Sequence, residues 1–156
     1  NLENLNLHWN DVIDISPLSN LINLKTLDLS GNEIENLNPL SKLVNLKELS
    51  LSDNKIRDLI PLRSLTNLEY LSLQENSFSD LTPLKELTNL KRLSSGFEDS
   101  SGKLLDFSPL ASLPNLEEIQ VSYYSDSDAG FHQPSEAQLE TIKLALPNVK
   151  VDGNSM

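Results

Sequence analysis

Hydrophobic and polar positions repeat along this chain with a period of 22 residues. Each unit opens with leucines in the spacing L-x-x-L-x-L, continues through an asparagine and a β-branched or aromatic residue, and closes with a proline–leucine pair. The template fits four consecutive units, over residues 2–24, 24–46, 46–68 and 68–90. A unit of this length cannot bury its apolar face alone, so the repeat predicts a solenoid in which neighbouring units stack.

Each unit divides into a predicted strand and a predicted turn. Over residues 26–30 the side chains alternate, with Leu27 and Leu29 on one side and polar residues on the other, as in a half-buried strand. One such strand per unit, in a constant register, predicts a parallel sheet with strands about 4.8 Å apart. Pro39 and its equivalents disfavour an α-helix, so we expect 3₁₀ or irregular turns that direct leucines inward. The wide turn side then curves the stack and leaves the sheet on the concave face.

An asparagine stands at the same position of each regular unit, at Asn10, Asn32, Asn54 and Asn76. An amide side chain both donates and accepts hydrogen bonds, so it can satisfy backbone groups where the chain leaves the sheet. Asparagine also tolerates left-handed backbone in turns, which is the alternative explanation. Its recurrence beside two inward leucines favours a ladder of stacked asparagines.

The full pattern, L-x-x-L-x-L-x-x-N-x-I-x-x-L-x-P-L-x-x-L-x-x-L, resembles the leucine-rich repeats of the bacterial internalin class. The proline–leucine pairs are most specific to that class, and they recur from Pro17-Leu18 to Pro109-Leu110. The match is close over residues 2–90 and weaker up to Leu116. The resemblance implies an α/β fold: a right-handed leucine-rich-repeat solenoid with a parallel sheet on the concave face, 3₁₀ or irregular turns on the convex face and a C-terminal helical cap.

We expect a single leucine-rich-repeat domain over residues 1–156, with repeats at about 2–116 and a C-terminal cap at about 117–151. The template begins directly at Leu2, although the ends of a solenoid normally carry capping units. An N-terminal cap is therefore expected to be missing, with upstream sequence or a neighbouring molecule covering that end.

The C-terminal cap is predicted to contain one helix and one further strand. Ser135 and Gln138 form a capping-box sequence, and apolar residues then follow with helical spacing until Pro147. We therefore predict a helix from Ser135 to Leu146. The residues after Pro147 repeat the pattern that precedes the last regular strand, which predicts one more short strand through Val151.

The fifth unit departs from the template. Ser95 stands where a leucine is expected, and residues 94–103 are rich in serine, glycine and acidic residues. Insertions in repeat proteins map to loops on one face, often the binding face, so one interpretation is a loop beside the concave surface that presents Phe97. The other interpretation is a surface insertion without a binding role, since long loops cost little stability.

Composition excludes several classes of partner. The formal net charge of −11 disfavours nucleic acid, because a phosphate backbone would be repelled. The chain has no cysteine, which rules out disulfides and thiolate metal sites, and no apolar run long enough to suggest membrane insertion.

Residues for catalysis or metal binding are sparse. His8 and His132 fall at opposite ends of the predicted solenoid, so they cannot share a metal. Asp126 and Asp128 lack the glycine and glutamate that complete an EF-hand loop. No phosphate-binding loop, nucleophile elbow or H-E-x-x-H motif occurs. We therefore expect no metal, no cofactor and no enzymatic activity.

The side chains that alternate with the inward leucines are free to carry specificity. Aromatic and arginine residues dominate binding hot spots, and acidic residues along one border favour a basic partner in salt-sensitive association. The candidate binding residues on the concave face and its adjacent loops are Trp9, Asp28, Glu48, Asp53, Tyr70, Glu75, Arg92, Phe97, Tyr123 and Tyr124.

These residues predict a protein-binding module whose ligand is a protein or peptide. The resemblance to internalins implies a location on the surface of a bacterium or outside the cell. Two alternatives stay open at this point. One is a cytoplasmic scaffold or regulatory repeat domain within a larger protein, contacted through its ends. The other is a carbohydrate ligand that stacks on the aromatic side chains.

Overall fold

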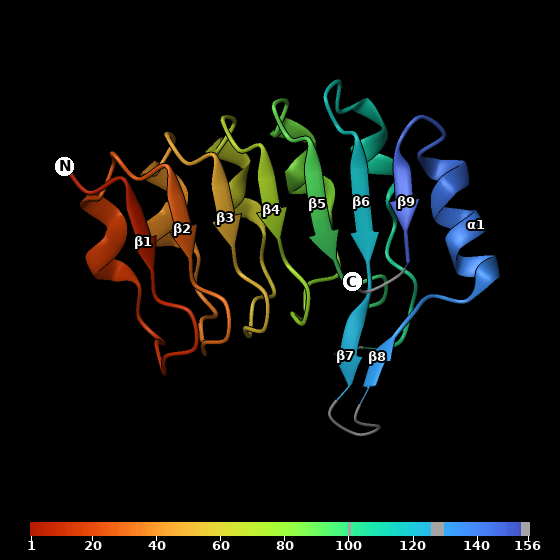
Figure 1. Cartoon of the computed structure of the whole chain (residues 1–156), viewed down its shortest axis with the longest axis horizontal. Helices are drawn as coiled ribbons and strands as arrows, with labels where there is room; N and C mark the ends of the chain where they lie inside the picture. The colour runs from red at the N-terminus through yellow and green to blue at the C-terminus, as the bar shows by residue number, and fades with distance from the viewer. Residues whose placement is uncertain (100, 126–129, 154–156) are drawn as a thin grey trace.

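The computed structural model describes residues 1–99, 101–125 and 130–153. Each 22-residue unit forms one coil of an open solenoid, in which a parallel sheet makes one layer and short 3₁₀ turns lie behind it (Figure 1). This arrangement confirms the predicted leucine-rich-repeat solenoid with its sheet on the concave face. In spatial order the strands of the sheet are β1 (Asn4–Asn6), β2 (Thr26–Asp28), β3 (Glu48–Ser50), β4 (Tyr70–Ser72), β5 (Arg92–Ser95), β6 (Glu118–Val121) and β9 (Lys150–Asp152).

The sheet keeps one register along its whole length. Leu27 of β2 lies beside Leu49 of β3, which lies beside Leu71 of β4, and the inward column continues in β5 and β6. These leucines are buried, because the next coil covers each one on either side. Burying a leucine side chain contributes about 1.5–3 kcal/mol, so the repeated column is the main source of stability.

The convex layer consists of 3₁₀ turns that begin at the predicted prolines. Each turn has a proline at its first or second position, and the leucine after that proline is buried. The turn closes when a backbone N–H donates to a carbonyl three residues earlier, as Leu40 does to Leu37 at 2.9 Å. The turns are η1 (Ser16–Asn20), η2 (Asn38–Lys42), η3 (Ile60–Ser64), η4 (Thr82–Glu86) and η5 (Ser108–Ser112).

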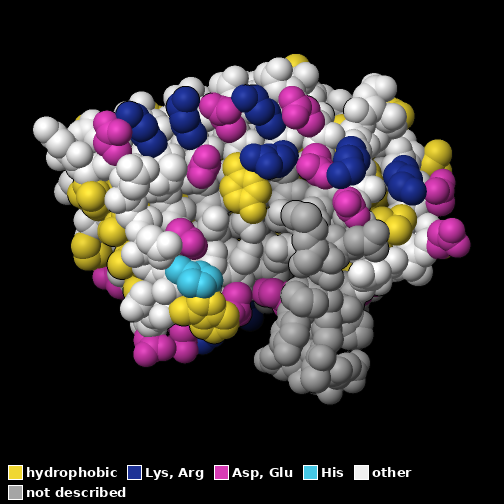
Figure 2. Space-filling model, viewed as in Figure 1, with side chains coloured by type: hydrophobic (Ala, Val, Ile, Leu, Met, Phe, Trp, Pro, Cys, Tyr) yellow, Lys and Arg dark blue, Asp and Glu magenta, His cyan; other side chains and the backbone are white. Residues whose placement is uncertain are grey.

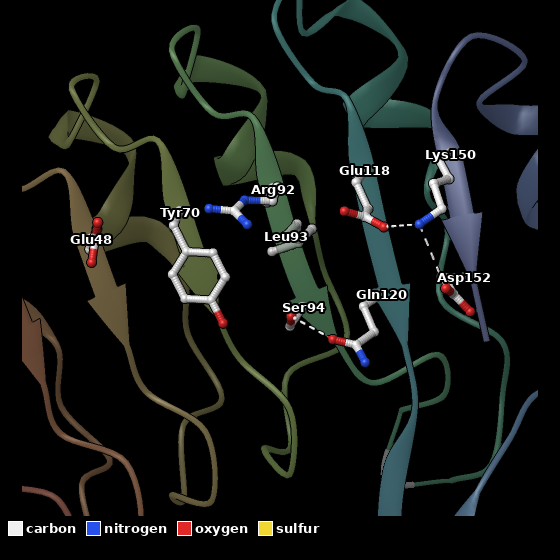
Figure 3. Close-up of a pocket in the computed structure, with 9 residues that line it drawn as sticks. All are labelled: Glu48, Tyr70, Arg92, Leu93, Ser94, Glu118, Gln120, Lys150 and Asp152. Carbon is white, nitrogen blue, oxygen red and sulfur yellow. Dashed lines mark hydrogen bonds and ion pairs between the residues drawn. The ribbon is translucent and has the colours of Figure 1, made fainter. Parts of the chain in front are cut away.

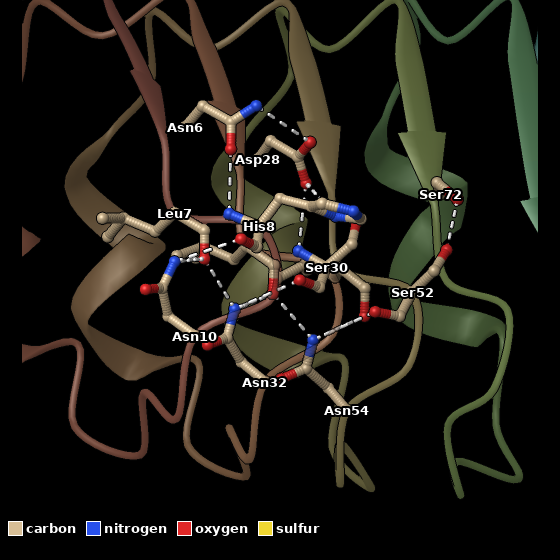
Figure 4. Close-up of polar contacts among 12 residues, drawn as sticks. Asn6, Leu7, His8, Asn10, Asp28, Ser30, Asn32, Ser52, Asn54 and Ser72 are labelled. Carbon is tan, nitrogen blue, oxygen red and sulfur yellow. Dashed lines mark hydrogen bonds and ion pairs between the residues drawn. The ribbon is translucent and has the colours of Figure 1, made fainter.

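The predicted asparagine ladder is confirmed (Figure 4). The Asn54 amide donates to the carbonyl of Leu51 in its own coil at 3.1 Å and to that of Leu29 in the preceding coil at 3.0 Å. Its oxygen accepts from the N–H of Ile34 at 2.9 Å. Asn32 and Asn76 repeat these contacts, so the ladder ties each coil to the one before it.

Left-handed backbone, the alternative explanation for these asparagines, falls on the preceding residue instead. Trp9, Gly31, Asp53 and Glu75 have φ values of 51°, 68°, 55° and 54°. This position turns the chain out of the strand, and the asparagine after it then reaches back to the exposed carbonyls. One residue therefore makes the left-handed turn, and the asparagine after it makes the hydrogen bonds to the backbone.

The fifth coil corrects the expectation that its loop presents Phe97. The Phe97 side chain is only 3% exposed and belongs to the hydrophobic core. The inserted segment folds back on itself, with the N–H of Leu105 donating to the Phe97 carbonyl at 2.9 Å and a bridge between Glu98 and Leu104. Ser95, at the expected leucine position, is fully buried, so Phe97 supplies apolar volume that this coil would otherwise lack.

The C-terminal cap contains the predicted helix and strand. The helix α1 spans Glu136–Ala145, and its capping box is formed: the N–H of Gln138 donates to the Ser135 hydroxyl at 3.3 Å, and the N–H of Ser135 donates to the Gln138 side chain at 2.8 Å. Buried Ile142 and Leu146 attach the helix to the core, and β9 adds to the sheet beside β6 (Figure 1). A short antiparallel pair, β7 (Tyr123–Ser125) and β8 (Gly130–His132), projects beyond the end of β6.

The insertion and the cap are joined. The amide of Gln138, on the first turn of α1, donates to a carboxylate oxygen of Glu98 at 2.6 Å. This contact anchors the inserted segment to the capping helix rather than leaving it as a separate surface loop.

The first coil packs on one neighbour within this chain. Leu5 and Leu7 are half-buried, whereas their equivalents in later coils are fully buried, and Leu2, Ile13 and Ile22 are exposed.

Candidate functional site

The outward side chains of the strands form two rows across the concave face. The register of the sheet places equivalent residues of adjacent strands side by side. The first row contains Asn4, Thr26, Glu48, Tyr70, Arg92, Glu118 and Lys150. The second row contains Asn6, Asp28, Ser50, Ser72, Ser94, Gln120 and Asp152.

Tyr70 and Arg92 meet at the centre of the first row (Figure 3). The guanidinium carbon of Arg92 lies 5.7 Å from the centroid of the Tyr70 ring, which is a cation–π arrangement. The two residues line a hollow of about 420 Å³ that extends from Glu48 to the cap strand β9. Small second-row residues such as Ser94 leave the larger first-row side chains standing above the floor of the hollow.

The C-terminal side of the hollow is closed by an ion-pair network. The Lys150 ammonium bonds to the Glu118 carboxylate and lies 3.7 Å from that of Asp152. The hydrogen bond from Lys150 to Glu118, with the attraction between their charges, raises the pKa of Lys150 above its ordinary value. Lys150 and Asp152 were missed in the sequence, although the strand that carries them was predicted. Their positions on the predicted strand could have revealed them, because they extend the two rows by one strand.

Acidic and basic side chains are interspersed along the rim where the strands begin (Figure 2). Lys25 pairs with Glu3 at 2.7 Å, and Glu69 pairs with both Lys47 at 3.5 Å and Lys91 at 2.7 Å. The hydrogen bond from Lys91 lowers the pKa of Glu69. These exposed pairs contribute little stability individually, but they leave this rim with balanced charge.

Trp9 forms a second aromatic position, at the first coil. Its side chain is 69% exposed and lies directly on Gly31, where an added Cβ would come within 2.7 Å of the indole ring. The His8 ring meets it edge-on, with centroids 5.7 Å apart. Asp53 adopts a left-handed φ similar to that of Gly31 without being glycine, so the close approach of Trp9 is what requires glycine here.

The four acidic candidates do not form a single border. Glu48 lies in the first row and Asp28 in the second, whereas Asp53 and Glu75 occupy the left-handed turns after the strands. Asp28 also accepts from the N–H of Ser30 at 3.0 Å and from the Asn6 amide at 3.5 Å, so part of its role is structural. The concave face therefore carries mixed charge.

Of the remaining aromatic candidates, the structure places only the Phe97 side chain. Phe97 is in the core, so it is removed from the candidate binding surface. Tyr123 and Tyr124 begin the β7–β8 pair, and their side chains lie outside the part that the structure describes.

Over residues 1–99, 101–125 and 130–153, no cluster of three or more histidine, aspartate or glutamate side chains could hold a metal ion. In the same residues, no helix is long and apolar enough to cross a membrane.

The fold and the polar concave face define a solenoid repeat protein. Comparison with known proteins shows to which repeat family it belongs. A sequence profile described as "Leucine Rich repeats (2 copies)" matches residues 1–42 and again 44–86. The chain belongs to the leucine-rich repeat family, among its bacterial internalin-like members. No curated protein sequence matches it significantly.

Three solved structures are similar to the chain. Internalin C2 of Listeria monocytogenes shares 35% identity over 96% of this chain, with a TM-score of 0.71. The internalin inlF of the same organism shares 30% over 81%, with a TM-score of 0.51. A leucine-rich-repeat protein of Leptospira interrogans shares 29% over 97%, with a TM-score of 0.74. This chain spans 61%, 50% and 37% of the lengths of these three proteins, in that order.

Proposed function

We propose that this chain is a protein-binding module that takes a protein or peptide partner on its concave face, centred on Tyr70 and Arg92. The observation that carries the proposal is the exposed Arg92 guanidinium over the half-buried Tyr70 ring, in a hollow that small residues such as Ser94 also line. Tyrosine and arginine are enriched among residues that dominate binding energy. Leucine-rich-repeat domains are commonly interaction modules, which supports the same reading.

The proposal includes a non-catalytic role and a location on the bacterial surface or outside the cell. The likeness to internalins supports that location. The exposed charges of the first row favour association that weakens as salt is added, because salt screens interactions between exposed charges.

Peptide selection tests the proposed site directly. A displayed library of random peptides is selected on the wild-type domain, and the dissociation constants of the binders are then measured for Tyr70→Ala and Arg92→Ala. Each substitution is expected to weaken binding about tenfold or more, the loss of about 1.4 kcal/mol or more that marks a hot spot.

Arg57→Ala is the matched control, because Arg57 is an exposed arginine that does not line the hollow. It should leave the dissociation constants unchanged. Neither Tyr70 nor Arg92 belongs to the hydrophobic core, so thermal unfolding should stay near that of the wild type. The proposal would be overturned if neither substitution changed the dissociation constants of the binders, or if the selection yielded no binders.

A further inference from the structure

We infer that the hollow recognises a partner segment that carries both a basic group and an acidic group, the basic group placed on Glu48 and the acidic group on Arg92. The inference rests on the proposed function and adds the charge pattern of the partner. It differs from the basic partner that the sequence favoured.

The first observation is which charges of the first row are already neutralised. Lys150 and Glu118 pair with each other, and Lys150 also lies near Asp152. By contrast, in the described part of the chain neither Glu48 nor Arg92 forms an ion pair. Among the described residues, the hollow thus contains one carboxylate and one guanidinium that have no ion-pair partner.

The second observation is the direction of the Arg92 side chain. Arg92 lies beside Glu118 in the register of the sheet, yet its guanidinium turns the other way, toward Tyr70 (Figure 3). Glu118 is instead engaged by Lys150. Stacking on a ring uses the face of the guanidinium and leaves its N–H groups at the edge, where they can donate to a carboxylate.

The third observation is spacing. Glu48, Tyr70 and Arg92 occupy equivalent positions of three consecutive strands. Neighbouring strands lie about 4.8 Å apart, so the backbone positions of Glu48 and Arg92 are about 10 Å apart, with Tyr70 between them. A segment that crosses the strands would meet a carboxylate, an aromatic ring and a guanidinium in that order.

Charge complementarity then selects among partners. A partner that covers the hollow removes water from both charges, and a buried charge without a counter-charge is strongly unfavourable. A purely basic segment would satisfy Glu48 and leave Arg92 unpaired, and a purely acidic one would do the reverse. A segment with both signs satisfies the two residues together.

The experiment repeats the peptide selection on a charge-reversed double variant, Glu48→Lys/Arg92→Glu, which keeps the net charge. Wild type is expected to select peptides with one basic and one acidic residue, and these should bind the reversed variant at least tenfold more weakly. The reversed variant should select the opposite order of charges. Replacing the acidic residue of a wild-type binder by its amide should weaken binding to wild type but not to Arg92→Ala.

Glu33→Lys/Lys55→Glu is the control, since it reverses an exposed ion pair of 3.0 Å outside the hollow and also keeps the net charge. It should select the same peptides as the wild type. Peptides that are weakened by Tyr70→Ala but carry no charge pair, or that bind the reversed variant equally well, would overturn the inference and leave the proposed site standing. Peptides whose binding is unchanged by Tyr70→Ala and by Arg92→Ala would contradict both the proposed site and this inference.

Discussion

Asparagine has two separate structural uses in each coil, and only one was predictable. The ladder at Asn32, Asn54 and Asn76 was inferred because an amide beside two inward leucines has an evident task. A second ladder lies at the opposite end of the strand, where the Asn45 amide donates to the Ile22 carbonyl and the Asn67 amide to the Val44 carbonyl, both at 2.8 Å. The signal was an asparagine before the first leucine of each unit, which reads as an ordinary polar position.

At the residue scale, replacing Asn54 with alanine should be markedly destabilising. The change leaves the buried Ile34 N–H without its acceptor, whereas the Leu29 carbonyl keeps its hydrogen bond from the Asn32 amide at 2.9 Å. An unpaired buried group costs about 1–3 kcal/mol, so the free energy of unfolding should fall by about 2 kcal/mol in chemical denaturation.

Asn10→Ala is the matched control, because its two hydrogen bonds to the carbonyls of Leu7 and His8 are exposed to water. A loss at Asn10 as large as that at Asn54 would contradict the role assigned to burial.

The elements of the chain were predictable to the extent that their signals are local. Strands and 3₁₀ turns follow from alternation and from proline, and the start of α1 follows from the serine and glutamine of its capping box. The placement of Phe97 is not local, because it depends on core volume that Ser95 leaves unfilled and on the fold of a segment held by α1. For the same reason the hollow was foreseen only in part, through Tyr70 and Arg92 but without Lys150 and Asp152 of the cap strand.

A side-chain hydrogen bond to the backbone recurs at the start of the 3₁₀ turns. Asp80 accepts from the N–H of Thr82 at 2.8 Å, and bonds from the Thr82 hydroxyl and N–H lower its pKa. Asp106 has its pKa lowered by the hydroxyl and N–H of Ser108, and Asp14 by the N–H and hydroxyl of Ser16.

These turns should make the fold sensitive to acid. A carboxyl with a lowered pKa in the folded state stabilises the fold fully above its ordinary pKa of about 3.9, and that contribution is lost as pH falls through the folded value. In the triple variant Asp14→Asn/Asp80→Asn/Asp106→Asn the three groups no longer titrate. The stability advantage of the wild type over this variant should therefore be largest near neutral pH and shrink below about pH 4.

Thermal unfolding across a pH series measures this difference. The chain contains its own precedent for the substitution, since Asn36 accepts from the N–H of Asn38 at 3.0 Å in the same position of another turn. A constant difference between the two proteins across the whole series would rule out the turns as a source of acid sensitivity.

On the scale of the whole molecule, the cap and the repeats act as one surface. The two rows run from β1 to β9, so the strand that closes the solenoid also completes the hollow. Lys150 pairs with Glu118, which lies beside Arg92 in the sheet, so a residue of the cap contacts the row that crosses the repeats.

Lys150→Ala should weaken the binding of the peptides selected on wild type severalfold. The Glu118 carboxylate would then be released and would compete with the acidic group of the peptide for Arg92. Adding Glu118→Gln should restore most of the affinity, which a general loss of structure would not allow. Lys143→Ala removes the same charge from α1, where Lys143 pairs with Glu140, and should have no effect on the dissociation constant. Failure of Glu118→Gln to rescue binding would show that Lys150 does not act through Glu118.

The constant register has a consequence for how such an arc can vary. Trp9 depends on the second coil through Gly31, and Tyr70 depends on Glu48 and Arg92 of the coils on either side of it. One extra unit inserted between the second and third coils would repeat lateral bonds that already exist and disturb neither aromatic. It would lengthen the reach between them by about 4.8 Å, one strand spacing. The distance between the Trp9 and Tyr70 side chains can thus be changed in steps of one coil, while the local packing of each side chain stays the same.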